Sequence, residues 1–300
     1  MASVACVGMT VHDRILSVPF LPAEATKLYA SAVAEAGGGP AATAAVAIVG
    51  LSGTARLFGR VGADDTGRLI RAELLRYGVD AAGVAELEGA QSAWSAVAVD
   101  PAGERLILNF PGHGLQVEPA WIGADALAGC GAILVDMGWP LGAARALAIA
   151  GEHGIPAVLD ADLGPLPEAS ALIDHAGHVV FSEPALRHHS GQPEPEAGLR
   201  ALRSRLPRTT LGVTIGPQGY LWLEGDAVRH LTPPRVAVVD TLGAGDVFHG
   251  AYALALAEGA GIAQAARFAV AAATLKCARP GGRAGVPSRP EVEALLAQPW

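Results

Sequence analysis

Lysine is almost absent from this chain of 300 residues. Its two lysines are Lys27 and Lys276, and the other 19 of its 21 basic residues are arginine. The chain also has 29 acidic residues, so its formal net charge is −8, and no run of basic residues occurs. Proteins that bind nucleic acid normally carry a basic patch or stripe. The composition therefore argues against a nucleic-acid partner.

Cysteine is scarce as well, and Cys6, Cys130 and Cys277 lie far apart. The sequence has no CxxC or Cys/His spacing typical of zinc sites, so we expect unpaired thiols in a reducing compartment. The first residues lack the basic and apolar segments of a signal peptide. No apolar run approaches the about 20 residues of a membrane-spanning helix. These features predict a cytoplasmic protein without a membrane partner.

Charged residues make up only 17% of the chain, whereas 51% of it is hydrophobic. That composition supplies a large core and excludes general disorder. Short apolar runs alternate with helix-length segments, which predicts a doubly wound α/β fold over residues 1–300, with a mostly parallel sheet and helices on both faces. Expected strands include 3–8 and 54–61. Expected helices include one with Asp65 or Thr66 as its N-cap and others at 244–258 and 262–277.

Two regions, about 14–33 and 91–110, alternate polar and apolar residues and do not fit this rhythm. The first predicts strands at 14–18 and 27–33, and the second a hairpin that turns at 101–103. We expect them to form a small β-sheet beside the main sheet. Two hairpins are marginally stable alone in water, so we also expect this small sheet to join two copies into a homodimer.

The most informative segment is DTLGAGD, residues 240–246, before a helical pattern. An apolar strand is expected to end at Asp240 and Thr241, followed by the turn Gly243-Ala244-Gly245. Small residues let backbone N–H groups converge on an anion at the positive end of the helix. Asp246 in the first helical turn can then take a proton from a hydroxyl that attacks phosphorus. A plain glycine turn capped by Asp246 is the alternative, which the full motif disfavours.

DTLGAGD resembles the C-terminal motif of the ribokinase-like sugar kinases, the PfkB family. Gly37-Gly38-Gly39 and FGRVGADDTG, residues 58–67, resemble its N-terminal motif, and the resemblance extends over essentially the whole chain. It implies an ATP-dependent sugar kinase. In that family the glycine turn, here Gly243, Ala244 and Gly245, binds the ATP phosphates, and the aspartate, here Asp246, deprotonates the sugar hydroxyl.

The same resemblance implies further site residues. Asp13 would hold sugar hydroxyls, and Gly38 and Gly39 would let the backbone approach the sugar. The nucleotide would be bound by Thr214, Gly216, Gly219 and Thr241. The ordinary alternatives are a turn cap for Asp13, a tight turn before a helix for the glycine pair, and a strand-end turn for 214–219.

Two departures from the family pattern affect cofactors. Ala42 stands where the family usually has an asparagine that contacts the sugar. The family's N-x-x-E motif, which orders magnesium, becomes Ser182-Glu183-Pro184-Ala185, so Glu183 is the nearest substitute for the missing glutamate. Mg²⁺ is still implied because phosphoryl transfer needs a cation at the phosphates. A monovalent cation is a further cofactor that the resemblance leaves open.

The substrate is less determined. GGGPAAT, FSEP and RPGGRAG resemble the 6-deoxy-6-sulfofructose kinases, which phosphorylate a ketose at C1. Lys27 and Asn109 in the small β-sheet are candidate ligands for the sugar and its anionic group, although an edge-strand charge and a turn residue are equally ordinary explanations. Gly138 stands where that branch has an arginine, and His113 is a weak substitute.

Several alternatives therefore stay open: a fructokinase or ribokinase, a nucleoside kinase of the same fold, or a catalytically weak sugar-binding regulator. A P-loop kinase and a Rossmann dehydrogenase are disfavoured because GxxxxGK[ST] and an early GxGxxG are missing.

Overall fold

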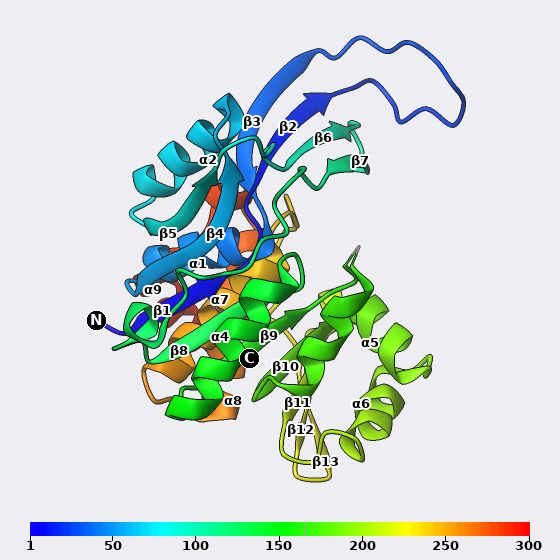
Figure 1. The fold of residues 1–300 in the computed structure, drawn as a ribbon. Coiled ribbons are helices and arrows are strands. Elements are labelled where there is room, and N and C mark those ends of the chain that lie inside the picture. Colours follow the sequence, from blue (N-terminus) through cyan, green and yellow to red (C-terminus); the bar gives the residue numbers. More distant parts are fainter. Residues whose placement is uncertain (165) are drawn as a thin grey trace.

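A nine-stranded sheet forms the centre of the molecule in the computed structural model, which describes residues 1–164 and 166–300 (Figure 1). Its strand order is β13-β12-β11-β10-β9-β8-β1-β4-β5, and only the pairs β11–β12 and β12–β13 are antiparallel. The strands are β1 (Ser3–Val7), β4 (Thr54–Gly62), β5 (Asp80–Leu87), β8 (Ala132–Asp136), β9 (Ala157–Ala161), β10 (His178–Ser182), β11 (Thr210–Thr214), β12 (Tyr220–Glu224) and β13 (Ala227–Leu231).

The strand order reverses at β1. The chain proceeds from β1 outward to β4 and β5, then returns to the other side of β1 as β8. The central strands β8 and β9 are buried at every position, as expected of parallel strands covered on both faces. In such sheets, ligands bind beyond the carboxyl ends of the strands at the point of reversal. The fold therefore directs attention to the residues that follow β1 and β8.

Helices cover both faces of the sheet, each over its own hydrophobic core. Along β1, Val4 and Cys6 belong to one core, and Ala5 and Val7 belong to the other. The first core packs against α1 (Pro40–Gly50), α2 (Asp65–Arg76), α7 (Ala244–Ala257), α8 (Ile262–Cys277) and α9 (Arg289–Leu296). The second packs against α3 (Ala124–Leu127), α4 (Pro140–His153), η1 (Pro167–Asp174), α5 (Glu183–Ser190) and α6 (Pro195–Arg203).

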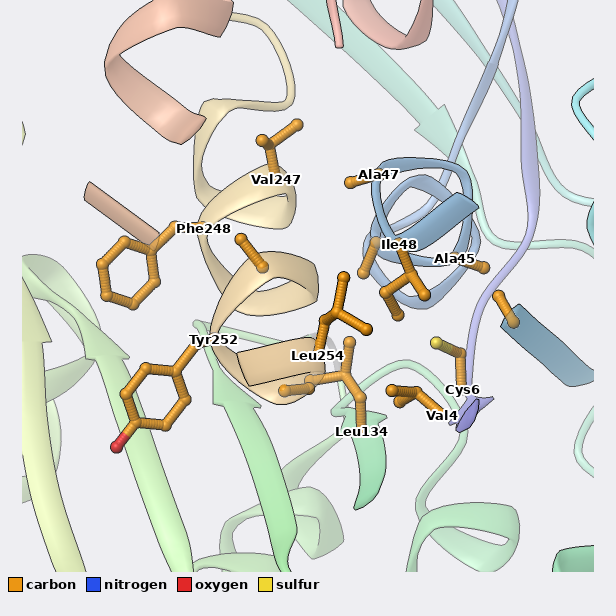
Figure 2. Close-up of a cluster of buried hydrophobic side chains, with 14 of the residues drawn as sticks. Val4, Cys6, Ala45, Ala47, Ile48, Leu134, Val247, Phe248, Tyr252 and Leu254 are labelled. Carbon is orange, nitrogen blue, oxygen red and sulfur yellow. The ribbon is translucent and has the colours of Figure 1, made fainter. Parts of the chain in front are cut away.

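Helices α1 and α7 lie side by side in the first core (Figure 2). Their surfaces are mostly small residues, and a Cβ atom at Gly250 would lie 2.6 Å from the Ala44 carbonyl oxygen. Glycine at this position thus permits the close approach of the two helices. As a result, the N-termini of α1 and α7, at Gly39 and Gly243, are both placed beside the carboxyl edge of the sheet.

A separate four-stranded sheet, ordered β3-β2-β6-β7, projects from the main body (Figure 1). It comprises β2 (Val11–Ser17), β3 (Ala32–Gly38), β6 (Trp94–Val99) and β7 (Arg105–Phe110). We call it the small sheet. The doubly wound fold with an added small β-sheet is therefore confirmed. In the part of the chain that the structure describes, no helix combines the length and the hydrophobicity needed to cross a membrane.

Three local predictions were wrong. Residues 27–31 belong to a long loop that extends away from the body, and the strand begins at Ala32 instead (Figure 1). Val238–Asp240 is not a strand, although Val239 and Asp240 donate backbone hydrogen bonds to the Cys277 carbonyl. Helix α2 is capped by Asp64, whose side chain accepts from the Gly67 N–H, rather than by Asp65 or Thr66.

Candidate active site

The glycine turn lies at the start of α7, as its sequence predicts. Gly243 is the N-cap and has φ 75°, a left-handed conformation that favours glycine. A Cβ atom at Gly245 would meet no heavy atom within 4 Å, so this side of the turn is open. The N–H of Ala244 instead closes the turn by donating to the Thr241 carbonyl at 3.2 Å. The open helix N-terminus is suited to an anion.

Asp246 directly follows Gly245 in the first turn of α7, and its side chain is partly exposed. Burial and the negative charge of Asp160 raise its pKa to about 7, while His249 and Arg283 act in the opposite direction. A carboxylate with this pKa accepts a proton far more readily at neutral pH than an ordinary aspartate does. Asp246 is therefore suited to general-base chemistry.

Two buried aspartates, Asp136 and Asp160, lie at or near the ends of strands β8 and β9. Asp160 lies near the end of β9, and burial together with the charges of Asp136 and Asp162 raises its pKa well above the ordinary value. The ring of His249, from α7, lies next to it. The Nδ1 atom of His249 is 3.4 Å from Asp160 Oδ2 and 2.7 Å from the Gly245 carbonyl oxygen. His249 thus connects the glycine turn with the end of β9.

Asp136 ends β8 at the point where the strand order reverses. Its Oδ2 atom accepts hydrogen bonds from the N–H groups of Met9 and Ala41, each at 2.9 Å, and Oδ1 accepts from Gly138 at 2.8 Å. Burial nevertheless raises the pKa of Asp136. These bonds tie the segment after β1 to the start of α1. The sequence analysis missed Asp136 and Asp160, although a carboxylate that ends a buried apolar strand is a usable signal.

A row of polar side chains crosses the small sheet. Asp13 on β2 is aligned with Ser95 on β6, which is aligned with Asn109 on β7. Ser95 Oγ hydrogen-bonds Asn109 Oδ1. Burial raises the pKa of Asp13, while a hydrogen bond from Ser95 and the charge of Arg283 oppose that rise. The structure thus brings two predicted sugar-binding residues, Asp13 and Asn109, into one row together with Ser95, which the sequence analysis did not identify.

The glycine pair lies against this row. A Cβ atom at Gly38 would be 2.4 Å from Asp13 Oδ2. Gly39 has φ 91°, and a Cβ atom there would be 2.4 Å from the Met9 carbonyl oxygen. Both positions therefore need glycine for the packing of the folded chain, and the open backbone at Gly38 leaves room for the Asp13 carboxylate.

Arg283, which lies in η3 (Gly282–Gly285), is a buried cation that the sequence analysis did not assign to the site. Its guanidinium donates to the Gly38 carbonyl at 2.7 Å and to Glu73 at 2.9 Å. Its Nε donates to Thr43 Oγ1 at 3.3 Å. Its positive charge counters the rise in the pKa of both Asp13 and Asp246. The charge of Arg283 therefore acts both on the polar row, at Asp13, and on the glycine turn, at Asp246.

The predicted nucleotide residues lie at the same edge of the main sheet. Thr214 ends β11, and its hydroxyl donates to the Phe181 carbonyl at 3.4 Å. Gly216 begins η2 (Gly216–Gln218), and a Cβ atom there would meet nothing within 4 Å. At Gly219, φ is 100° and a Cβ atom would lie 2.0 Å from the Leu231 carbonyl oxygen, so this glycine shapes the turn into β12. Thr241 is exposed just before the glycine turn.

Other predicted residues lie outside these contacts. Lys27 is exposed in the loop before β3, with its ammonium 5.2 Å from the centre of the Tyr29 ring. His113 is exposed, and its backbone pairs with that of Gln91. Glu183 begins α5 and pairs with Arg187 at 3.3 Å. Among residues 1–164 and 166–300, no cluster of three His, Cys, Asp or Glu side chains could hold a metal ion unaided.

An open helix start beside an aspartate with a raised pKa is the arrangement expected of a phosphotransferase site. The chain belongs to the pfkB family of carbohydrate kinases, whose family model matches residues 1–289.

Relatives support this assignment in detail. The crystal structure of a candidate ribokinase from Agrobacterium tumefaciens is 40% identical, with a TM-score of 0.93 over 98% of this chain and 96% of that one. Arabidopsis thaliana ribokinase, complexed with ribose and ATP, is 25% identical, with a TM-score of 0.86 over 99% of each chain. Ribokinase of Bacillus subtilis (strain 168) is 28% identical over 301 residues, 99% of this chain and 100% of that protein.

This protein is therefore an enzyme, an ATP-dependent sugar or nucleoside kinase of the ribokinase family. The predicted family and reaction class are confirmed. The finer assignment to the 6-deoxy-6-sulfofructose kinases stays a prediction, as do the roles of the individual site residues.

Proposed function

We propose that this kinase transfers the γ-phosphoryl group of ATP to a primary hydroxyl of a sugar, with Asp246 as the general base. The observation that carries the proposal is the position of Asp246, which has a pKa of about 7, at the glycine-turn start of α7. The sugar would lie against Asp13 and Asn109, and the phosphates at Gly243, Ala244 and Gly245. The loop 214–219 and Thr241 would contact the nucleotide.

In this mechanism Asp246 accepts the proton of the sugar hydroxyl as its oxygen bonds to phosphorus and the bond to the ADP oxygen breaks. The N-terminus of α7 stabilises the negative charge of the transferred group. Asp13 fixes the sugar by accepting hydrogen bonds from its hydroxyls, and Ser95 and the charge of Arg283 favour its ionised form. Arg283 connects the two halves by binding the Gly38 carbonyl.

Magnesium fits the charge distribution of the site. Burial and the charges of Asp136 and Asp162 raise the pKa of Asp160, and the charge of Asp160 in turn raises the pKa of Asp246, so a cation in that region would relieve the repulsion. We propose that Asp160 and Asp162 hold nucleotide-bound Mg²⁺ through water in place of Glu183, whose carboxylate pairs with Arg187. When bound, the ion would neutralise charge on the phosphates.

The base assignment is tested with Asp246→Asn. We expect kcat to fall by about 10²-fold or more, the size of a lost general base. Affinity for a non-hydrolysable ATP analogue, measured by calorimetry, should stay close to that of the wild type. Turnover near the wild-type rate would exclude Asp246 as the base. A matched loss of nucleotide affinity would indicate a binding role instead.

For the substrate we favour a ketohexose, phosphorylated at C1 when C6 carries an anionic group such as a sulfonate. The support is the resemblance of three sequence segments to the sulfofructose kinases and the position of Asn109 beside Asp13. Lys27 would have to reach the sugar from its exposed loop. At Gly138, a Cβ atom would lie 2.7 Å from the Cβ of Met9, so the arginine of that branch would not fit without rearrangement. Fructose, ribose and nucleosides are the competing substrates.

The substrate is tested by comparing kcat/KM for fructose, fructose 6-phosphate, sulfofructose, ribose and inosine. A contact between Lys27 and an anion should give a preference of about 10-fold or more for the charged ketose, and Lys27→Ala should remove it. A preference for ribose, inosine or plain fructose would overturn the ketose-anion assignment while leaving the kinase assignment intact.

A homodimer through the small sheet completes the proposal. The supporting observation is the exposure of apolar side chains on its edge strands: Val33 on β3 is 68% exposed, and Leu108 on β7 is 63% exposed. Light scattering at micromolar concentration should give twice the chain mass, and Leu108→Glu should give the monomer mass. Leu75→Glu, at an exposed apolar position on α2, is the control and should leave the mass unchanged. A monomeric wild type would remove the idea.

A further inference from the structure

Lys276 is the most deeply buried charge in the described parts of the chain, with 0% of its surface exposed. It lies in the last turn of α8, and the aliphatic part of its side chain packs beside Gly285, where a Cβ atom would lie 3.3 Å from Lys276 Cδ. Burying an ammonium costs several kcal/mol unless oxygen atoms replace its water. Its surroundings should therefore explain its presence.

The ammonium is bound by oxygen atoms of two loops. It donates to the Asp240 carbonyl at 2.8 Å and to the Arg279 carbonyl at 3.4 Å, and it lies 3.5 Å from Asp240 Oδ2. Asp240 is the first residue of the segment that leads into the glycine turn, and Arg279 begins the segment that leads into η3 and Arg283. The Lys276 ammonium thus links the segment before the glycine turn to the segment before η3.

The Asp240 carboxylate extends this connection. It accepts from the N–H of Leu242 at 2.9 Å and from those of Gly281 and Gly282 at 2.8 and 3.3 Å, and it pairs with Arg105 of the small sheet. Burial raises the pKa of Asp240, but these N–H groups and Lys276 outweigh it and lower the pKa below the ordinary value. The carboxylate is therefore ionised and oriented at neutral pH.

This arrangement does not fit an added monovalent cation. Proteins bind K⁺ with carbonyl and carboxylate oxygens that replace its water. The carbonyl oxygens of Asp240 and Arg279, with the Asp240 carboxylate, are such a set beside the glycine turn, and Lys276 Nζ already lies among them. A second cation at that point would meet an ammonium within contact distance.

We propose that Lys276 is a positioning residue whose tethered ammonium takes the place of a free monovalent cation, so that the glycine turn is ordered without K⁺. The inference rests on the proposed function of that turn as the phosphate site. It assigns no role in proton transfer to Lys276, which acts through the backbone of 240–243. The enzyme should therefore not respond to monovalent salts, whereas a neutral side chain at 276 should create such a response.

The test compares wild type with Lys276→Met, a neutral side chain of similar length. Activity is measured with tetramethylammonium chloride as the only salt, and then with K⁺ or NH₄⁺ at equal ionic strength. Wild-type kcat should be the same in all three. The variant should lose about 10- to 100-fold in kcat, as when a phosphate-binding turn is misplaced, and recover most of it with K⁺ or NH₄⁺. The KM for the sugar should hardly change.

Arg208→Met, which removes a single exposed charge elsewhere, should behave as wild type in every salt. Wild-type activation by K⁺ of about tenfold or more would overturn the inference. So would a variant that is fully active without K⁺, or one that is folded but not rescued. If Lys276→Met does not fold, the wild-type salt response and the Lys276→Gln variant decide the question.

Failure of the proposed function has a different signature. If no sugar or nucleoside is phosphorylated, affinity for a non-hydrolysable ATP analogue replaces turnover as the readout. Wild-type affinity should then be independent of K⁺, and that of Lys276→Met should increase with K⁺.

Discussion

The pH dependence of the reaction follows directly from the environment of Asp246. Burial and the charge of Asp160 raise its pKa from the ordinary 3.8 to about 7. A general base must be deprotonated to act, so activity should be lost as the pH falls through the pKa in the folded enzyme. The acid limb of kcat/KM should therefore lie near neutrality.

The size of the effect can be worked out from that value. One pH unit below the pKa, about one-tenth of the enzyme carries the base form, and two units below, about one-hundredth. Hence kcat/KM at pH 6 should be about tenfold below its plateau. An aspartate with an unperturbed pKa would instead give a flat profile above about pH 5.

Comparing wild type with Asp160→Asn distinguishes the titration of Asp246 from the titration of the nucleotide. The substitution removes the neighbouring negative charge, so the pKa of Asp246 should fall and the acid limb should move to lower pH. MgATP titrates identically with both proteins, so the displacement between the two profiles belongs to the enzyme. Asp174→Asn, which alters an exposed partner of Arg205, should leave the limb in place. A flat wild-type profile, or an unmoved limb in Asp160→Asn, would refute the reasoning.

Three further outcomes are expected. The pKa of Asp246 is higher in the folded than in the unfolded chain, so its charge destabilises the native state as the pH rises from about 4 to 7. Asp246→Asn should therefore raise Tm more at pH 8 than at pH 5. Equal increases of Tm at the two pH values would contradict this. Arg283→Leu removes the buried and closer of the two cations that pair with Glu73 and should destabilise by about 3–5 kcal/mol in urea unfolding, and adding Glu73→Gln should recover part of the loss. Gly39→Ala should cost about 1–3 kcal/mol because of its positive φ, whereas Gly151→Ala, at an open position, should not destabilise.

The sequence predicted those parts of the fold that follow from buried apolar periodicity. Helix α8 begins and ends at the predicted residues, Ile262 and Cys277, and β4 differs by one residue. β3 was placed wrongly because its sequence, AVAEAGG, is mostly exposed and lacks the usual β-branched alternation. Pairing with β2, rather than local propensity, makes it a strand. Val238–Asp240 shows the reverse case, since apolar residues without a partner strand form no strand.

The residues of the candidate site likewise fall into those that a local motif reveals and those that only the tertiary fold reveals. Asp246, Gly39 and Asp13 lie in short local motifs, so the sequence and its family resemblance could name them as candidates. Arg283 and Lys276 act on segments more than 30 residues away in sequence, which only the tertiary fold brings near them. A buried lysine in a chain with only two was the available signal, but composition alone does not tell which of the two is buried.

The carboxylates themselves argue for catalysis over simple sugar binding. Asp136, Asp160 and Asp246 each have a raised pKa, so the fold holds three aspartates where ionisation is unfavourable. Such a cluster lowers stability, and it lies beside a helix start that attracts anions. A sugar-binding regulator needs hydroxyl acceptors such as Asp13, but it has no use for a base that titrates near pH 7. In the proposed mechanism that base removes the hydroxyl proton, and the cation that accompanies ATP would offset the remaining charge. The raised pKa of Asp246 thus fits its proposed role as the general base.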